Sequence, residues 1–172
     1  MTEEKVILVD REDQPLGTME KMEAHEKGLL HRAFSVFVFN ENNELLLQQR
    51  ALHKYHSPGL WTNTCCSHQR WGEENTEAGR RRLKEEMGFS CELKEQFHFI
   101  YRADFDNGLT EHELDHVMIG HYSEDPVLNE DEVSDFMWMD LDKVKEDIER
   151  NPDKYTAWFK IIFKEYYQRL AS

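Results

Sequence analysis

One strong helix signal, set among apolar runs that are typical of strands, constrains the fold of this chain more than any other feature. The segment "NTEAGRRRLKEEMG", residues 75–88, begins with Asn75 as a helix-capping residue, has an acidic first turn and a basic middle, and ends at Gly88. The apolar runs "RAFSVFVFN" (32–40) and "ELLLQQRA" (44–51) precede it, and the "ENN" between them predicts a β-hairpin. The pattern therefore indicates a fold that combines a sheet with helices.

The rest of the chain extends this pattern without an internal repeat or a linker. We expect a strand at 5–10, a turn at 11–17 and a helix at 19–28 that ends at Gly28. Further strands are predicted at 96–105, 112–122 and 135–140, and helices at 141–151 and 157–170. A length of 172 residues suits one domain. We therefore expect a single domain over residues 1–172, an α/β (α+β) sandwich with a mixed β-sheet flanked by helices.

The charge of the chain restricts its partners. It carries 35 acidic and 21 basic residues, which gives a formal net charge of −14 at pH 7. Nucleic acids and anionic membranes are polyanions, so we expect neither as a partner, and an anionic small substrate would need a local group of basic side chains. No apolar run reaches the length of a membrane span and the N-terminus lacks a signal-peptide pattern, so we expect a cytoplasmic protein.

The stretch "TNTCCSHQRWGEEN", residues 62–75, places two adjacent cysteines close to a histidine. It is compatible with a metal site, a nucleophile or core packing. A redox pair is disfavoured, because a disulfide between sequence neighbours needs a strained ring and no CxxC motif is present. If the stretch is extended, Cys66 and His68 point to one face and Cys65 to the other. We therefore expect Cys65 to be packed in the core, whereas both a packed and a functional thiol remain open for Cys66.

The segment "TEHELDH" places Glu111 and Glu113 two residues apart, so on a strand they share a face. Paired carboxylates repel each other unless a cation or a proton lies between them, although in so acidic a chain a solvated strand edge is the simpler interpretation. His25, His31 and His68 come from separate segments. Together with the two glutamates they would make a mixed nitrogen and oxygen shell for a metal ion.

Several segments, in order, resemble one enzyme family. "SPGLWTNTCCSH" (57–68) is close to the cysteine motif of type I isopentenyl-diphosphate isomerase, "RRRLKEEMGF" (80–89) follows it, and "TEHELDH" (110–116) stands where that family has its glutamate motif. The resemblance extends from about Val6 to Trp158, and the combination is much more specific than any one piece. It implies a Nudix-like sandwich that interconverts isopentenyl diphosphate and dimethylallyl diphosphate. In that reaction one proton is added to the alkene and another is removed from a neighbouring carbon.

The resemblance also implies the residues that carry this chemistry. Cys66 and Glu113 are implied as the two proton-transfer groups, and Tyr101 as the residue that assists Glu113. Trp158 is implied as the aromatic face that stabilises a carbocation-like intermediate, because a ring attracts cations and is a poor nucleophile. From its sequence surroundings alone, Trp158 would be a packing residue of the last helix.

Two divalent ions and a diphosphate site are implied in the same way. A divalent ion, Mn²⁺, Mg²⁺ or Zn²⁺, would be held by His25, His31, His68, Glu111 and Glu113. Mg²⁺ bound to the diphosphate would use Glu86, whose simpler interpretation is an i,i+4 salt bridge with Arg82. The implied diphosphate-binding cations are Lys21, Arg50, Lys54 and Arg82.

The Nudix sequence box is degenerate in this chain. Ser67 stands at its first glycine, Glu73 and Arg81 match, and Arg82 replaces the glutamate that follows the arginine. The later positions agree: Leu83, Glu85, Glu86, Gly88 and Phe89. Losing an acidic metal ligand to Arg82 disfavours hydrolysis of a diphosphate and favours holding it intact. Two alternatives remain, a Nudix pyrophosphohydrolase and a non-catalytic metal-binding module, and a cysteine register shifted by one would make Cys65 the acid.

Overall fold

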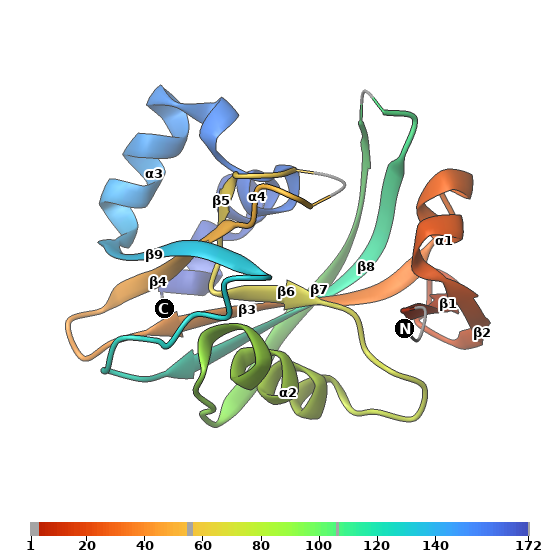
Figure 1. Ribbon diagram of the computed structural model, residues 1–172, viewed down its shortest axis with the longest axis horizontal. Helices are drawn as coiled ribbons and strands as arrows, with labels where there is room; N and C mark the ends of the chain where they lie inside the picture. The colour runs from red at the N-terminus through yellow and green to blue at the C-terminus, as the bar shows by residue number, and fades with distance from the viewer. Residues whose placement is uncertain (1–3, 55–56, 106, 172) are drawn as a thin grey trace.

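The computed structural model of the chain describes residues 4–54, 57–105 and 107–171. Its strands are β1 (Lys5–Val9), β2 (Pro15–Glu20), β3 (His31–Phe39), β4 (Glu44–Arg50), β5 (Trp61–Thr62), β6 (Cys65–Ser67), β7 (Leu93–Asp104), β8 (Thr110–His121) and β9 (Val133–Asp140). Its helices are α1 (Lys21–Lys27), α2 (Asn75–Met87), α3 (Leu141–Arg150) and α4 (Ala157–Ala171), with a short 3-10 turn at Pro152–Lys154. The sheet lies between α2 on one side and α3 and α4 on the other (Figure 1).

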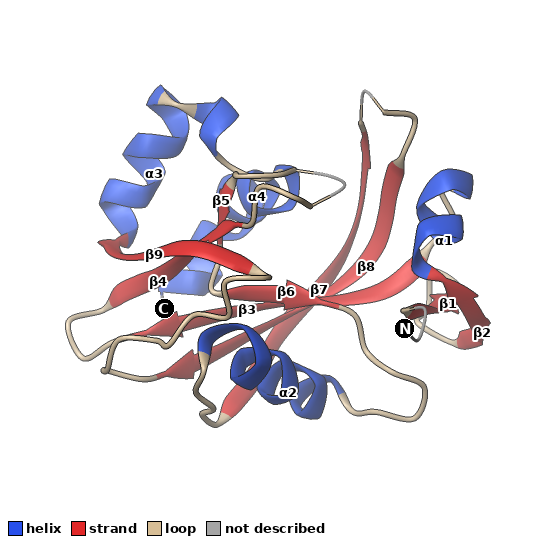
Figure 2. Ribbon diagram, viewed as in Figure 1, coloured by secondary structure: helices blue, strands red, loops and turns tan. Residues whose placement is uncertain are grey.

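β3 lies at the centre of the sheet and pairs along both of its edges. On one edge it runs parallel to β8, from the pair His31↔Glu113 to the pair Phe39↔His121, and β7 pairs antiparallel with β8. On the other edge β3 meets β1 at its start, β6 in its middle and β4 at its end. β4 then pairs with β5 and β9. The strands therefore form one part around β3 and another around β4, and the two are joined where β3 meets β4 (Figure 2).

The nearly continuous apolar run of β3 is explained by burial on both of its faces. Phe34, Val36 and Val38 belong to the core cluster on the side of α2. Phe37 belongs to the second cluster, on the side of α4, where its ring lies 5.9 Å from that of Phe159. Each fully buried side chain of this kind contributes roughly 1.5–3 kcal/mol relative to exposure. A two-sided core therefore holds α2 and α4 against opposite faces of one strand.

α2 confirms the predicted helix, but its N-terminal cap differs from the prediction. Asn75 was expected to be the cap, whereas it is the first helical residue and Glu74 is the cap. The Glu74 backbone N–H donates to the Glu77 carboxylate at 3.2 Å, as in a capping box. The Asn75 side-chain oxygen, which a cap would use, instead accepts from Gln69 at 2.9 Å, and its amide donates to Glu95 of β7 at 3.2 Å. Gly88 ends α2 in the left-handed conformation, as predicted.

The predicted hairpin between β3 and β4 is confirmed only at its turn. The side-chain oxygen of Asn40 accepts a hydrogen bond from the Glu44 backbone at 2.9 Å, which fixes the turn. The strands then share only the pair Phe39↔Leu45. They diverge because β6 pairs with the edge of β3 that faces β4, and β5 pairs with the edge of β4 that faces β3.

The predicted turn at 11–17 and helix at 19–28 are both too long, because β2 occupies the boundary between them. β2 begins at Pro15, and α1 begins only at Lys21. The residues of β2 are exposed or half-buried, so this strand has no apolar alternation that could have predicted it. The short strands β5 and β6 were likewise not predicted. The other predicted strands and helices are confirmed with small shifts of their ends.

Replacing Gly88 by alanine should destabilise the fold more than the same change at Gly72. Both glycines have left-handed backbones, with φ of 73° and 82°. A Cβ on Gly88 would lie 2.6 Å from the carbonyl oxygen of Val127, whereas a Cβ on Gly72 would meet nothing within 4 Å. We expect Gly72→Ala to lower the free energy of unfolding by about 1–2 kcal/mol, and Gly88→Ala by about 2–4 kcal/mol because a steric clash is added. Urea unfolding measures both losses, and equal losses would contradict the close contact.

Candidate active site

A cavity of 1090 Å³ collects side chains from most of the elements described above. It opens where α1, β3, β4, β6, α2, β8 and α4 each contribute at least one residue. The sequence-predicted residues that line it are Lys21, Arg50, Lys54, Cys66, His68, Arg82, Glu86, Glu111, Glu113 and Trp158. The other three predicted residues, His25, His31 and Tyr101, are buried beside Glu113. The fold therefore brings all of the predicted site residues to one region.

Three histidines and one glutamate form a compact group of possible metal ligands. The ligand atoms of His25, His31, His68 and Glu113 all lie within 4.8 Å of one another. His31 Nε2 and His68 Nε2 approach the same carboxylate oxygen of Glu113, at 3.1 Å and 3.0 Å. The parallel register of β3 and β8 places His31 directly opposite Glu113, while His25 comes from α1 and His68 follows β6.

Backbone carbonyls fix the orientation of two of these rings. His25 Nδ1 lies 2.7 Å from the Lys21 carbonyl oxygen, and His31 Nδ1 lies 2.9 Å from that of Leu29. A carbonyl oxygen only accepts, so each Nδ1 carries the proton and each Nε2 keeps its lone pair. The lone pair of His31 then faces the Glu113 carboxylate, and a cation or an added proton is needed to stabilise two acceptors in contact.

The electrostatics of this group fit a divalent metal ion. Burial lowers the pKa of His25 to about 4 and also lowers the pKa of His68, so both imidazoles are neutral near pH 7, as a metal ligand must be. Burial acts to raise the pKa of Glu113, but its close contacts with His31 and His68 hold that pKa well below its usual range. A neutral, nitrogen-rich donor set with one ionised carboxylate suits a divalent transition ion.

Tyr101 joins the two glutamates of β8 in one hydrogen-bonded group. Its partner in the β7–β8 register is Glu113, and its hydroxyl donates to Glu113 Oε1 at 2.5 Å and to Glu111 Oε1 at 3.2 Å. Burial and the neighbouring charge of Glu113 raise the pKa of Glu111 well above its usual range. Glu111 lies outside the group of ligand atoms that gathers within 4.8 Å. Its role as a metal ligand therefore stays a prediction.

The two adjacent cysteines of β6 lie in different environments. Cys65 is fully buried in the core cluster against α2, whereas Cys66 lines the cavity, as does His68. This is the separation that an extended strand predicts. Burial raises the pKa of Cys66 above its usual range, opposed by the charge of Arg50 and by a hydrogen bond with Trp158. The Cys66 thiol therefore keeps its proton at neutral pH and can act as a proton donor.

Two of the predicted diphosphate-binding lysines form ion pairs inside the cavity. Lys21 contacts Glu4 at 2.7 Å, and Lys54 contacts Glu132. Both glutamates line the cavity with their lysines. Sequence reasoning did not single out either glutamate, because a chain with 35 acidic residues offers no signal that distinguishes them.

The two predicted arginines contact an acid and an aromatic ring. Arg82 donates to Glu86 Oε2 from two nitrogens, at 2.5 Å and 3.0 Å, which is the salt bridge that helix spacing predicted. Gln48 donates to the other oxygen of Glu86 at 2.9 Å. The guanidinium carbon of Arg50 lies 5.3 Å from the ring centroid of Trp158. Gln48 was also missed by sequence reasoning, although a polar residue that interrupts a buried apolar strand is the kind of signal that could have found it.

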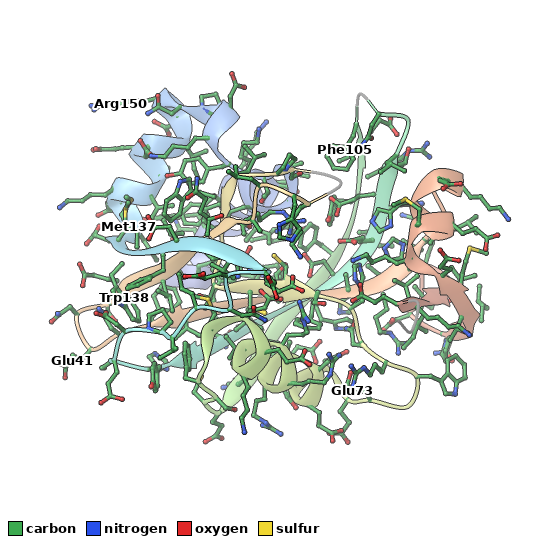
Figure 3. All side chains as sticks on the ribbon, viewed as in Figure 1. Glu41, Glu73, Phe105, Met137, Trp138 and Arg150 are labelled. Carbon is green, nitrogen blue, oxygen red and sulfur yellow. The ribbon has the colours of Figure 1, made fainter. Side chains whose placement is uncertain are left out.

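The residues of the degenerate Nudix box are joined to one another by ion pairs. Glu73, in the loop before α2 (Figure 3), pairs with Arg81 at 2.8 Å. Glu85 pairs with Arg81 at 3.3 Å and with Arg82 at 3.1 Å. Each acidic position of the box is therefore next to an arginine of α2.

Comparisons with known proteins decide the family. The NUDIX domain family matches residues 29–159. The isopentenyl-diphosphate Delta-isomerase 2 of Aromatoleum aromaticum is 53% identical over 156 residues, which cover 91% of this chain and 82% of the relative. The chain belongs to the isopentenyl-diphosphate Delta-isomerase family. Another isomerase of this family, from Pectobacterium atrosepticum, is 50% identical over 171 residues, which cover 98% of this chain and 96% of the relative. The family resemblance found in the sequence motifs is therefore confirmed.

Solved structures at low identity support the fold of the isomerase family. The crystal structure of a Deinococcus radiodurans protein matches with a TM-score of 0.76 at 16% identity, covering 95% of this chain and 99% of that chain. The MutT protein of Methanosarcina mazei matches with a TM-score of 0.68 at 17% identity, covering 83% of this chain and 96% of that chain. The predicted Nudix-like sandwich is confirmed. None of the described helices has the length and apolar character needed to cross a membrane.

Removing His68 should weaken metal binding and leave the fold intact. His68→Gln takes away one of four donors from a loop position next to the cavity, so we expect the affinity for Mn²⁺ to fall by at least about tenfold. His121→Gln, at an exposed histidine on the same sheet, is the matched control and should bind as the parent does. Titration calorimetry of metal-free protein with Mn²⁺ measures both, and an unchanged affinity in His68→Gln would contradict the assigned donor group.

Proposed function

We propose that this chain isomerises isopentenyl diphosphate to dimethylallyl diphosphate, with Cys66 as the proton donor and Glu113 as the proton acceptor on opposite sides of the substrate. The observation that carries this proposal is the placement of the two residues. β6, which holds Cys66, and β8, which holds Glu113, pair with opposite edges of β3, and both side chains line one cavity. A flat alkene held between them is open to proton addition at one carbon and proton removal at another.

The protonation step explains why the donor is a buried thiol. An unactivated alkene is a weak base, so the acid must keep its proton until the alkene is held against it in a site that excludes water. Burial raises the pKa of Cys66, which keeps the thiol protonated. The thiol proton then passes to the terminal carbon of the double bond, and positive charge develops at the tertiary carbon.

The second step removes a proton from the carbon on the other side of that charge. A C–H bond next to a carbocation is strongly acidic, so the ionised Glu113 can accept its proton even though its pKa is low. The Tyr101 hydroxyl, 2.5 Å from Glu113 Oε1, orients this carboxylate. The double bond re-forms one position along the chain, and the diphosphate stays attached throughout.

Trp158 is suited to stabilise the positive charge between these steps. Its side chain is buried and lines the same cavity as Cys66, so its ring lies near the point of protonation. An indole face attracts a cation by roughly 0.5–2 kcal/mol and does not form a bond to it. Packing in the α4 cluster and stabilisation of the intermediate are compatible roles for this residue.

Two divalent ions and four cationic side chains complete the proposed site. We assign Mn²⁺, Mg²⁺ or Zn²⁺ to the donor group described above, with Glu111 as a further ligand, and Mg²⁺ on the diphosphate to Glu86. When bound, these ions supply positive charge that neutralises the diphosphate and tunes the acidity of Glu113. The diphosphate itself would be held by Lys21, Arg50, Lys54 and Arg82.

We further propose that the chain acts as one domain in the cytoplasm on a small diphosphate substrate, without a nucleic-acid or membrane partner. The net charge of −14 supports this, because it repels polyanions, while the cavity still gathers basic side chains for a small anion.

Incubation with isopentenyl diphosphate and Mg²⁺ in deuterated water tests the reaction directly. We expect proton and phosphorus NMR to show dimethylallyl diphosphate that carries deuterium, with no release of phosphate, because both proton transfers exchange with solvent and no phosphoryl bond breaks. Cleavage of a nucleoside diphosphate compound without movement of the alkene would instead support a Nudix pyrophosphohydrolase. Metal binding without either activity would support a binding module.

Separate substitutions of the two cysteines test the proton donor. Cys66→Ala should lower kcat by roughly 10²–10⁴-fold, because it removes the general acid. Cys65→Ala should retain most of the activity and mainly lower stability, because Cys65 is buried in the core cluster against α2. Equal loss of activity in both variants, at matched folding measured by circular dichroism, would overturn the assignment of Cys66.

A further inference from the structure

Glu132 lines the cavity from the loop before β9, and its backbone is held on two sides. Its carbonyl oxygen accepts from the Ala51 N–H at 3.1 Å, and its own N–H donates to the Asn129 carbonyl at 2.9 Å. Asn129 in turn donates to the backbone carbonyl of Glu86, at the end of α2, at 2.9 Å. The loop therefore fixes the position of Glu132 relative to both β4 and α2.

The side chain of Glu132 shares its cations with the predicted diphosphate site. It forms an ion pair with Lys54 and contacts Arg82 Nη2 at 3.4 Å. The same Nη2 atom lies 2.5 Å from Glu86 Oε2. Arg82 therefore neutralises two carboxylates at once, and one of them, Glu86, is almost completely buried.

Binding of a diphosphate changes this balance of charge. The step rests on the proposed function, in which Lys54 and Arg82 turn toward the phosphates. Once they do so, Glu86 and Glu132 lose their shared cation while a highly charged anion arrives beside them. Like charges in contact at a partly desolvated site oppose binding.

Both carboxylates remain next to the cavity when this happens, one through its side chain and the other through its backbone. Gln48 holds Glu86 Oε1 at 2.9 Å and is itself anchored to the Thr64 carbonyl at 2.7 Å. Hydrogen bonds fix the backbone of Glu132 beside the cavity, and its side chain is only partly exposed. Two carboxylates that stay next to a diphosphate are compensated by a divalent cation, since carboxylate and phosphate oxygens are the ligands that Mg²⁺ prefers.

We propose that Glu132 is a specificity-determining residue of the diphosphate site, which acts with Glu86 to make the cavity accept a diphosphate with its divalent cation and reject the free anion. In the empty cavity Glu132 holds Lys54 and Arg82 in place. With the diphosphate bound, its charge disfavours any complex that lacks the cation. The expected signature is the dependence of diphosphate affinity on Mg²⁺, and catalytic turnover is not needed to observe it.

Titration calorimetry with inorganic pyrophosphate, with and without added Mg²⁺, tests this role. For each protein the affinity for pyrophosphate with Mg²⁺ is divided by the affinity without Mg²⁺. This ratio is then compared between the parent chain and Glu132→Gln. We expect Glu132→Gln to lower the ratio by about tenfold, chiefly by tightening binding without Mg²⁺, since it removes one like charge. Glu130→Gln removes an exposed charge from the same loop and should keep the parent ratio. Glu132→Ala provides a second variant of different shape.

Three outcomes decide between the alternatives. A lower ratio in both Glu132 variants, with Glu130→Gln unchanged, supports the proposal. An unchanged ratio, or an equal weakening with and without Mg²⁺, overturns it and leaves Glu132 a structural residue. Isomerisation of isopentenyl diphosphate by the parent chain is measured in the same samples, so that absence of turnover counts against the proposed function alone and an unchanged ratio counts against the role of Glu132 alone.

Discussion

The parallel pairing of β3 with β8 is the interaction on which the rest of the structure depends. It runs the whole length of β3, so the register of nine consecutive pairs is fixed together. That register places His31 opposite Glu113, and the antiparallel pairing of β8 with β7 then places Tyr101 on the other side of Glu113. One carboxylate is thereby held between an imidazole and a phenol by backbone hydrogen bonds. The site has its geometry because the sheet has its register.

The second constraint is charge in a site that excludes much of the solvent. Glu86, Glu111 and Glu113 are all buried, and each accepts a hydrogen bond from another element: Glu86 from Gln48 of β4, and the two others from Tyr101 of β7. Buried carboxylates without such partners would be neutralised or would destabilise the fold. The same arrangement that makes these groups tolerable in the folded protein also leaves them dependent on the cations that reach the cavity. Folding and ligand binding therefore rest on the same ion pairs.

Much of this could be predicted from the sequence, and what failed did so for identifiable physical reasons. α2 and the long strands were predicted because their patterns are local. Asn75 was assigned to the cap because local preference was the only information. Its side chain is engaged by Gln69, before the helix, and by Glu95, 20 residues further along the chain. β2 escaped prediction because an edge strand without a buried face has no alternation of apolar residues. The outcome for the β3–β4 hairpin depended on β5 and β6, two short strands that no local pattern describes.

The candidate site was also predicted only in part, and for similar reasons. The separation of Cys65 from Cys66 followed from strand alternation alone. The gathering of His25, His31 and His68 required the tertiary fold; residue types suggested it and family resemblance implied it. Glu132 and Gln48 were missed because their significance lies in the residues that they touch.

The two neighbouring cysteines of β6 show how a small difference in position separates a thiol in the candidate active site from a thiol in the core. They are the same amino acid, joined by one peptide bond, and only the side of the strand to which each belongs distinguishes them. The position of a cysteine along the strand, odd or even, therefore decides whether its thiol faces the cavity or the core. The identity of the residue alone does not decide this. An insertion or deletion of one residue before Cys65 would exchange the two environments and leave the composition of the motif unchanged. Conservation of spacing in this segment is then as strict a chemical requirement as conservation of the cysteine itself.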